Sequence, residues 1–267
     1  MMSSQTESPA SGRTPRRMEL GQLDGFDLHA EYHSDRTGGD FFDAIYLGSH
    51  VIFLLSDIAG TKEETQPVAA EVQETFRRQG TELLGAKGTN VMDATAQLVQ
   101  VVNHALIRAS GGLRFSPTFL GCYDLSLGIL AYVNAGALTA VFHDSEGARL
   151  LTSESVPLGL FTHLTHEPSM QAFEPGAKLL LVTKGVMETR HGRTHFGVER
   201  LIPLLENTAP GFATDSAQEI CHASLRAAVE FKQIPWYSLK NLPFMRGDGD
   251  EDLTALAVAR PRKDAVA

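Results

Sequence analysis

Two adjacent segments with the apolar spacing of long helices constrain the fold most. They cover residues 64–84 and 91–108, and apolar residues in the second recur at helical spacing along one face. Segments of β type come before and after this helical pair and do not alternate with it. Blocks of this kind are typical of α+β folds whose sheets are mainly antiparallel.

The expected strands are marked by alternation and by β-branched or aromatic residues. They cover residues 26–32, 41–47, 51–56, 118–124, 130–134, 138–143, 178–183 and 253–260. Tight turns at Gly48-Ser49 and around Gly128 predict two hairpins. Two further helices are expected over 197–206 and 216–231, and Ser216 with Glu219 has the form of a capping box.

The length of 267 residues, with 43% hydrophobic and 21% charged residues, is that of an ordinary globular chain. Residues 1–17 are polar and have little to bury, so we expect a disordered tail there. No second linker follows. One domain is therefore expected over residues 18–261, with a short C-terminal tail over 262–267.

Charge and hydropathy exclude several classes of protein. The net charge of −9 argues against a nucleic-acid binder, which needs a basic face. No apolar run approaches the roughly 20 residues of a membrane helix, and no leader-like segment follows the N-terminus. Cys122 and Cys221 lie in apolar patterns and are expected to be buried and reduced. These features favour a cytoplasmic protein; the oligomeric state stays open.

Two carboxylates fall at the ends of expected paired strands. Asp40 follows two glycines at the start of one strand, and Asp57 ends the next, before a turn of small residues. Together with the Ile58 carbonyl they could hold one hard cation. The alternative is plain turn chemistry, because Asp and Gly are common turn residues.

The order of several short motifs along the chain favours a cation site over simple turns at Asp40 and Asp57. They are Gly38-Gly39-Asp40, Asp57-Ile58-Ala59-Gly60, Asn134-Ala135-Gly136, Pro157-Leu158-Gly159, Thr183-Lys184-Gly185, Phe196-Gly197-Val198-Glu199-Arg200-Leu201 and Glu251-Asp252-Leu253-Thr254. Their succession over residues 23–260 resembles the SpoIIE-like branch of the PPM (protein phosphatase 2C-like) family. The resemblance implies an α-β-β-α sandwich in which helices flank two mainly antiparallel sheets.

The resemblance also implies a metal-dependent protein Ser/Thr phosphatase. Two Mg²⁺ or Mn²⁺ ions would activate a water for attack on a phosphoserine or phosphothreonine, with no covalent nucleophile. Asp40, Asp57 and the Ile58 carbonyl match the ligands of one metal position. Gly39, Asp43 and Asp252 are expected next to the ligands.

The second metal position departs from the family pattern. The family has aspartates where this chain has Lys184 and Glu251, and Ala137 replaces a histidine. Glu251 keeps a carboxylate, one methylene longer, and is the weaker candidate among the metal ligands. An ammonium group has no lone pair for a metal and adds positive charge. We expect Lys184 to pair with Asp57 or Glu251 and to displace the second ion; the alternative is that Lys184 extends into solvent.

Two functions therefore remain open. One is a phosphatase, with activity left uncertain by Lys184 and Glu251, that acts on a phosphorylated anti-sigma-factor antagonist or a similar signalling protein. The other is a pseudophosphatase that binds a phosphoprotein or kinase partner without hydrolysing it.

Other segments carry weaker signals. The pairs His163/His166 and His191/His195 have metal-like spacing but no third ligand nearby in sequence, so solvated loop histidines are the favoured interpretation. The apolar, Pro-rich segment over 235–245 is expected to pack over the core, or else to form a partner-binding flap.

Overall fold

The computed structural model describes residues 15, 23, 25–33, 38–86, 88–152, 155–209, 214–232 and 252–262. Of the two expected tails, the described residues include only Pro15 and Arg262. The bounds of the domain therefore stay predictions. The segment over 235–245 lies outside the described residues. No helix in the described part of the chain is long and apolar enough to cross a membrane.

Two five-stranded sheets form the centre of the fold, and every strand pair in them is antiparallel. The first has the order β2 (Asp40–Leu47), β3 (His50–Asp57), β4 (Thr118–Asp124), β5 (Ile129–Ala135), β8 (Ser169–Ala172). The second has the order β1 (Asp27–His33), β12 (Leu253–Ala259), β9 (Lys178–Val182), β6 (Thr139–Asp144), β7 (Gly147–Leu150).

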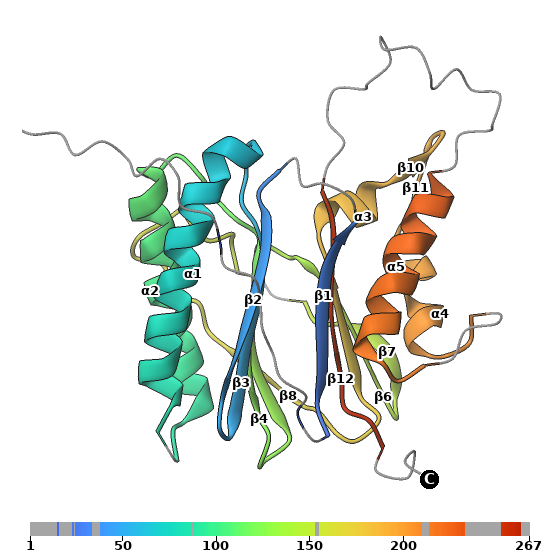
Figure 1. The fold of residues 1–267 in the computed structure, drawn as a ribbon, viewed down its shortest axis with the longest axis horizontal. Helices are drawn as coiled ribbons and strands as arrows, with labels where there is room; N and C mark the ends of the chain where they lie inside the picture. Colours follow the sequence, from blue (N-terminus) through green and yellow to red (C-terminus); the bar gives the residue numbers. More distant parts are fainter. Residues whose placement is uncertain are drawn as a thin grey trace, which may run out of the picture.

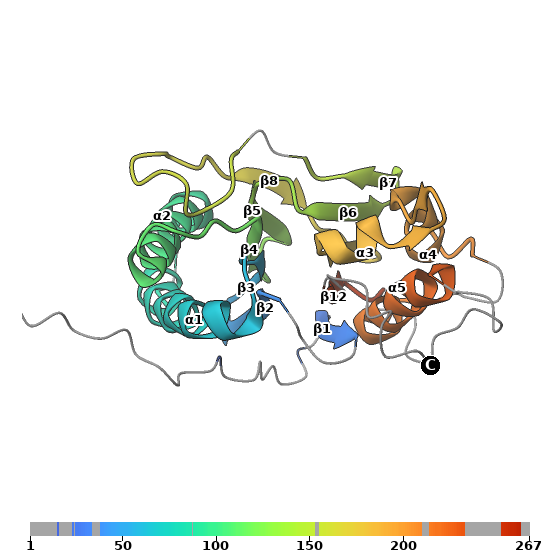
Figure 2. The ribbon, with the colours of Figure 1, turned by 90° about the horizontal axis from the view of Figure 1, so that it is seen from above.

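Helices cover the outer faces of both sheets (Figure 1). The first sheet carries α1 (Lys62–Leu84) and α2 (Val91–Ser110). The second carries α3 (Lys184–Glu188), the 3₁₀ turn η1 (Val198–Arg200), α4 (Ile202–Leu205) and α5 (Ala217–Phe231), and β10 (Arg190–His191) pairs with β11 (Thr194–His195). Viewed from above, the two helical layers lie on opposite sides of the paired sheets (Figure 2). The α-β-β-α prediction is confirmed.

Strand β3 shows how the sequence produces the layers. Ile52 and Leu54 pack with α1 and α2, whereas Val51, Phe53 and Leu55 pack towards the second sheet. Side chains alternate between the faces of a strand, so a strand covered on both faces must be apolar throughout. A third apolar cluster fills the space between the second sheet and α5.

Local differences from the expected elements have physical causes. Helix α1 begins at Lys62, because the Glu64 carboxylate accepts the Thr61 N–H at 3.0 Å. Pro67 therefore lies in the second turn of α1. The single helix predicted over 197–206 is divided into η1 and α4, with Pro203 in the first turn of α4.

Strands β7 and β8 are absent from the expected set. Their four-residue segments are partly exposed and lack the apolar alternation that marks a half-buried strand. Ser216 caps α5, as predicted, and its hydroxyl accepts the Glu219 N–H. Both cysteines are buried, and burial raises the pKa of the Cys122 thiol to about 12.

Candidate functional site

The β2–β3 hairpin brings the two predicted carboxylates together. Asp40 and Asp57 are direct partners in the antiparallel register, at the start of β2 and the end of β3. Asp40 is 2% exposed, while Asp57 is only partly buried. Opposed residues of an antiparallel pair have Cβ atoms about 5 Å apart, close enough for one cation to reach both carboxylates.

The backbone around Ile58 depends on a close contact with Gly39. The Ile58 N–H donates to the Gly39 carbonyl at 3.2 Å. A Cβ added to Gly39 would lie 1.8 Å from the Ile58 oxygen, which no side chain tolerates. Glycine at this position therefore lets the Ile58 carbonyl approach the start of β2, as the Gly-Gly-Asp motif suggests.

Two threonines from the second sheet hold Asp40. The Thr183 hydroxyl, at the end of β9, donates to Asp40 Oδ2 at 2.7 Å. The Thr254 hydroxyl, near the start of β12, donates to the same oxygen. These bonds cross from one sheet to the other and leave Oδ1 as the Asp40 oxygen that can serve a cation.

The charge balance of the site favours a cation. Burial raises the pKa of Asp40 well above its usual range, and the neighbouring Asp57 carboxylate raises it further. The hydroxyls of Thr254 and Thr183 oppose this shift. Two adjacent carboxylates and a backbone carbonyl form an all-oxygen donor set, which is the kind that Mg²⁺ and Mn²⁺ prefer. The residues present thus fit a hard divalent ion.

A cavity of about 270 Å³ opens over these groups, between the ends of the two sheets. This is the upper end of the sandwich in Figure 1, where α3 lies. Its walls are formed by Gly38, Gly39, Asp40, Asp57, Ile58, Ala59, Gly60, Phe115, Pro117, Lys184, Gly185 and Asp252. The structure therefore brings Asp40, Asp57, Ile58 and Lys184 into one site.

Lys184 is the first residue of α3 and a wall of the cavity, and its side chain is 56% exposed. Its ammonium forms an ion pair with Glu188, one turn later in α3, at 3.4 Å. An exposed pair of this kind contributes little stability. The expected pairing of Lys184 with Asp57 or Glu251 stays a prediction.

Asp252 occupies a more central place than the sequence suggests. It lines the cavity, and both of its carboxylate oxygens accept the Gly38 N–H at 3.0 Å. Glu251, the residue aligned with a family ligand, lies outside the described residues. Asp252 thus places a carboxylate in the same cavity as Lys184.

Asp43 does not line the cavity, and its carboxylate forms an ion pair with Arg77. Its carboxylate accepts two bonds from the Arg77 guanidinium of α1, each at 2.6 Å, and one from the Ala44 N–H at 2.9 Å. Burial raises the pKa of Asp43, and Arg77 opposes the shift. Asp43 therefore fastens α1 to β2, three residues after Asp40.

Thr183 and Thr254 were not among the expected site residues. Both belong to motifs that mark the family resemblance, one before Lys184 and one after Asp252. Their places in these motifs were the sequence signal that could have identified them. His166, by contrast, was expected to be solvated but is 3% exposed, and its ring contacts the Ser155 hydroxyl.

Comparison with known families agrees with this fold. The family model described as Stage II sporulation protein E (SpoIIE) matches residues 48–261, most of the chain. The chain belongs to the SpoIIE family. Its fold is the phosphatase-like domain expected from the motifs.

A curated relative of this SpoIIE-family domain is Protein IcfG of Synechocystis sp. (strain ATCC 27184 / PCC 6803 / Kazusa). The two are 24% identical over 212 residues, which are 70% of this chain and 33% of the relative. The domain thus spans about a third of the length of that protein.

Solved structures share the fold of the SpoIIE-family domain. The RsbU and RsbW domains of Rv1364c from Mycobacterium tuberculosis match with a TM-score of 0.66 and 21% identity, over 89% of this chain and 60% of that one. The PP2C phosphatase domain of SpoIIE from Bacillus subtilis, solved with a fragment of its regulatory domain, gives 0.65 and 15%, over 93% and 64%. The catalytic domain of the serine threonine protein phosphatase PstP, in complex with two manganese ions, gives 0.58 and 14%, over 88% and 98%.

Proposed function

We propose that this domain is a metal-dependent phosphoprotein phosphatase, specific for phosphoserine or phosphothreonine. The observation that carries the proposal is the convergence of Asp40, Asp57 and the Ile58 carbonyl in one cavity. Membership of the SpoIIE family supports it, as does the fold shared with a serine threonine protein phosphatase in complex with manganese.

The proposed site would hold one Mn²⁺ or Mg²⁺ ion. Asp40 Oδ1, Asp57 and the Ile58 oxygen would hold it, while Thr183 and Thr254 keep Asp40 in position. A bound divalent cation supplies Lewis-acid chemistry, polarising phosphoryl oxygens and lowering the pKa of water. The cavity opens to solvent at this end of the sandwich, where a phosphorylated side chain from another protein could enter.

The second metal position is the compromised one in this proposal. Lys184 brings a positive charge to the wall of the cavity that Asp57 also lines, and this charge would repel a second divalent ion. The same ammonium could bind a phosphoryl oxygen, because it carries three donors. Lys184 would then act as a phosphate-binding group in place of one metal.

The proposed substrate is a phosphorylated anti-sigma-factor antagonist or a similar signalling protein. The basis is the SpoIIE-like family resemblance. One matching structure, which contains RsbU and RsbW domains, supports the same class of pathway.

A pseudophosphatase is the second candidate function, and the place of Lys184 favours it. If hydrolysis needs two metals, a lysine at one ligand position leaves phosphoprotein binding without turnover. A phosphatase and a pseudophosphatase should both bind the phosphoprotein, but only the phosphatase should release phosphate from it.

Phosphate release from a phosphoserine peptide with Mn²⁺ tests the proposal. We expect wild type to be active, Asp57→Asn to be inactive, and Lys184→Asp/Glu251→Asp to be faster than wild type. Lys184→Gln removes the charge without adding a ligand. Lys232→Asp, at the exposed residue that follows α5, makes the same charge change as Lys184→Asp but does not line the cavity. Activity equal in wild type and Asp57→Asn would refute the enzyme proposal.

Activity only in the Lys184→Asp/Glu251→Asp variant would favour the pseudophosphatase. A phosphopeptide-binding titration with wild type completes that result, because the pseudophosphatase must still bind. A wild type that neither binds nor hydrolyses phosphopeptides would contradict both candidates.

A further inference from the structure

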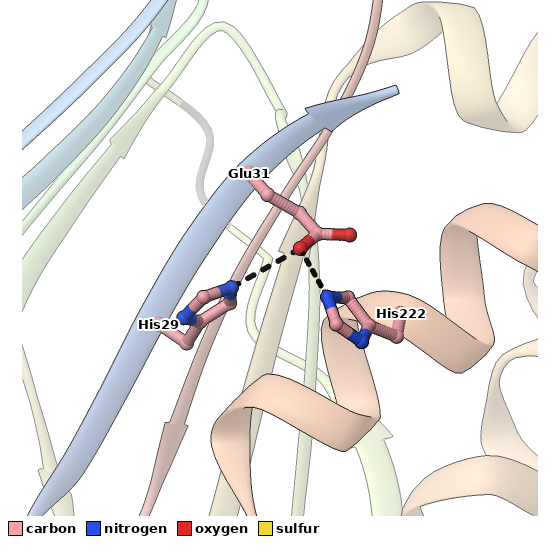
Figure 3. Close-up of side chains that lie close together, drawn as sticks. All are labelled: His29, Glu31 and His222. Carbon is pink, nitrogen blue, oxygen red and sulfur yellow. Dashed lines mark hydrogen bonds and ion pairs between the residues drawn. The ribbon is translucent and has the colours of Figure 1, made fainter. Parts of the chain in front are cut away.

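A second cluster of ligand-type side chains lies away from the cavity, between β1 and α5 (Figure 3). It consists of His29, Glu31 and His222. One donor atom from each lies within 4.8 Å of the other two, and in the described part of the chain only these residues meet that criterion. None of the three takes part in the proposed hydrolytic site.

The two imidazoles point at the same carboxylate oxygen. His29 Nε2 lies 3.1 Å from Glu31 Oε2, and His222 Nε2 lies 2.6 Å from it. Figure 3 shows both rings turned towards Glu31, one from the strand and one from the helix. Donor atoms of a tetrahedral zinc site, with bonds of about 2.0–2.1 Å, lie roughly 3.3 Å apart. Small side-chain rotations would therefore admit an ion.

The backbone that carries the cluster is held in place. His29 and Glu31 are two residues apart on β1 and share one face of the strand. The Asp27 carboxylate accepts the Ala217 N–H at the start of α5, at 2.7 Å. The Cys221 thiol donates to the His29 carbonyl at 3.4 Å. These two contacts fix α5 against β1, so the three ligands do not have to be assembled by the ion.

The cluster is partly exposed to solvent. The side chains of His29, Glu31 and His222 are 31%, 25% and 53% exposed. Two histidines and one glutamate are a ligand set that zinc uses when a fourth position is kept open. We propose that His29, Glu31 and His222 bind a zinc-class transition-metal ion, with a fourth position open to solvent, and that the ion cross-links edge strand β1 to α5.

The donor chemistry separates this site from the hydrolytic one. Imidazole nitrogens favour Zn²⁺ and Co²⁺, whereas the all-oxygen cavity suits Mg²⁺ and Mn²⁺. A titration of Zn²⁺ in excess Mg²⁺ therefore reports on the nitrogen-containing cluster. This site does not depend on the proposed phosphatase activity.

The test is calorimetric Zn²⁺ binding to the metal-stripped full chain in excess Mg²⁺. We expect one Zn²⁺ per wild-type chain. Loss of a ligand in His222→Asn or Glu31→Gln should weaken binding by more than the 10–100-fold that loss of an outer partner costs. The double variant His191→Asn/His195→Asn, in the exposed β10–β11 hairpin, should bind like wild type.

Two further measurements keep the result unambiguous. Zn²⁺ at 100-fold above its Kd should raise the thermal midpoint of wild type by roughly 5–10 °C, and that of His222→Asn much less. Circular dichroism without metal checks that His222→Asn, at an exposed helix position, is folded. Zn²⁺ affinity that is unchanged in His222→Asn, or lost equally in the hairpin variant, would overturn the proposal, as would no binding to wild type.

Discussion

At the scale of single residues, the site depends on how one buried carboxylate is held. A charge on Asp40 is costly, because Asp40 is 2% exposed and lies next to Asp57, and both effects raise its pKa. Two hydroxyl donors, one just after β9 and one in β12, offset part of that cost, and a cation would offset more. The orientation of Asp40 is therefore set by residues far away in sequence, Thr183 and Thr254.

Thr254→Val should weaken Mn²⁺ binding about 10–100-fold, because it removes one hydroxyl from Asp40 and keeps the shape of the side chain. Thr254→Ser retains the hydroxyl and serves as the control, with near wild-type affinity. Calorimetric titration of Mn²⁺ measures both. Equal losses of Mn²⁺ affinity in Thr254→Val and Thr254→Ser would show that packing, and not the hydrogen bond, is responsible.

At the scale of elements, the start of β2 must approach the chain just after β3. Gly39→Ala would place a methyl group 1.8 Å from the Ile58 oxygen and force the two segments apart. We expect loss of Mn²⁺ binding and of phosphate release, with a smaller change in overall stability. Gly112→Ala controls for backbone strain outside the cavity, because its added Cβ meets no atom but its φ of +73° strains an alanine. Retained Mn²⁺ affinity in Gly39→Ala would contradict this role of Gly39.

Helix α1 is joined to β2 by a buried charge pair. Arg77→Met leaves the fully buried Asp43 without its cation and should cost roughly 2–4 kcal/mol of unfolding free energy, near the range for broken buried pairs. The double variant Arg77→Met/Asp43→Asn should recover part of this loss, since no buried charge remains. Urea denaturation compares the two; equal destabilisation would argue against the charge as the cause.

At the scale of the whole molecule, two histidines, one buried and one partly buried, should contribute less to stability as the pH drops below about 6.5. Burial lowers the pKa of His166, and burial followed by the charge of Lys178 lowers that of His143. A histidine with a depressed folded pKa binds protons more readily when unfolded, so protonation favours the unfolded chain. The stabilising contribution is thus present above the unfolded pKa and lost as the pH decreases.

His166→Gln should flatten this dependence between about pH 7.5 and 5.5, by up to about 1.4 kcal/mol per pH unit. His195→Gln, at an exposed position, should leave the slope of wild type unchanged. Urea denaturation at several pH values measures the slope. A steeper dependence in His166→Gln would show that the sign is wrong.

The sequence by itself determined most of the local elements and half of the site. The apolar run of β3 indicated a strand covered on both faces, and the motifs placed Asp40 and Asp57 at the ends of paired strands. Such signals are local, because side-chain period and turn residues act over a few positions. The hairpin that joins these two residues is equally local, so its register could be foreseen.

Only the tertiary structure decided what reaches those carboxylates from elsewhere. Thr183 and Thr254 meet Asp40 because the two sheets pack face to face, and Asp252 lines the cavity for the same reason. His29 and His222, 193 positions apart in the chain, meet because α5 packs on β1. Contacts of this range depend on how layers pack, which no local period of the sequence encodes.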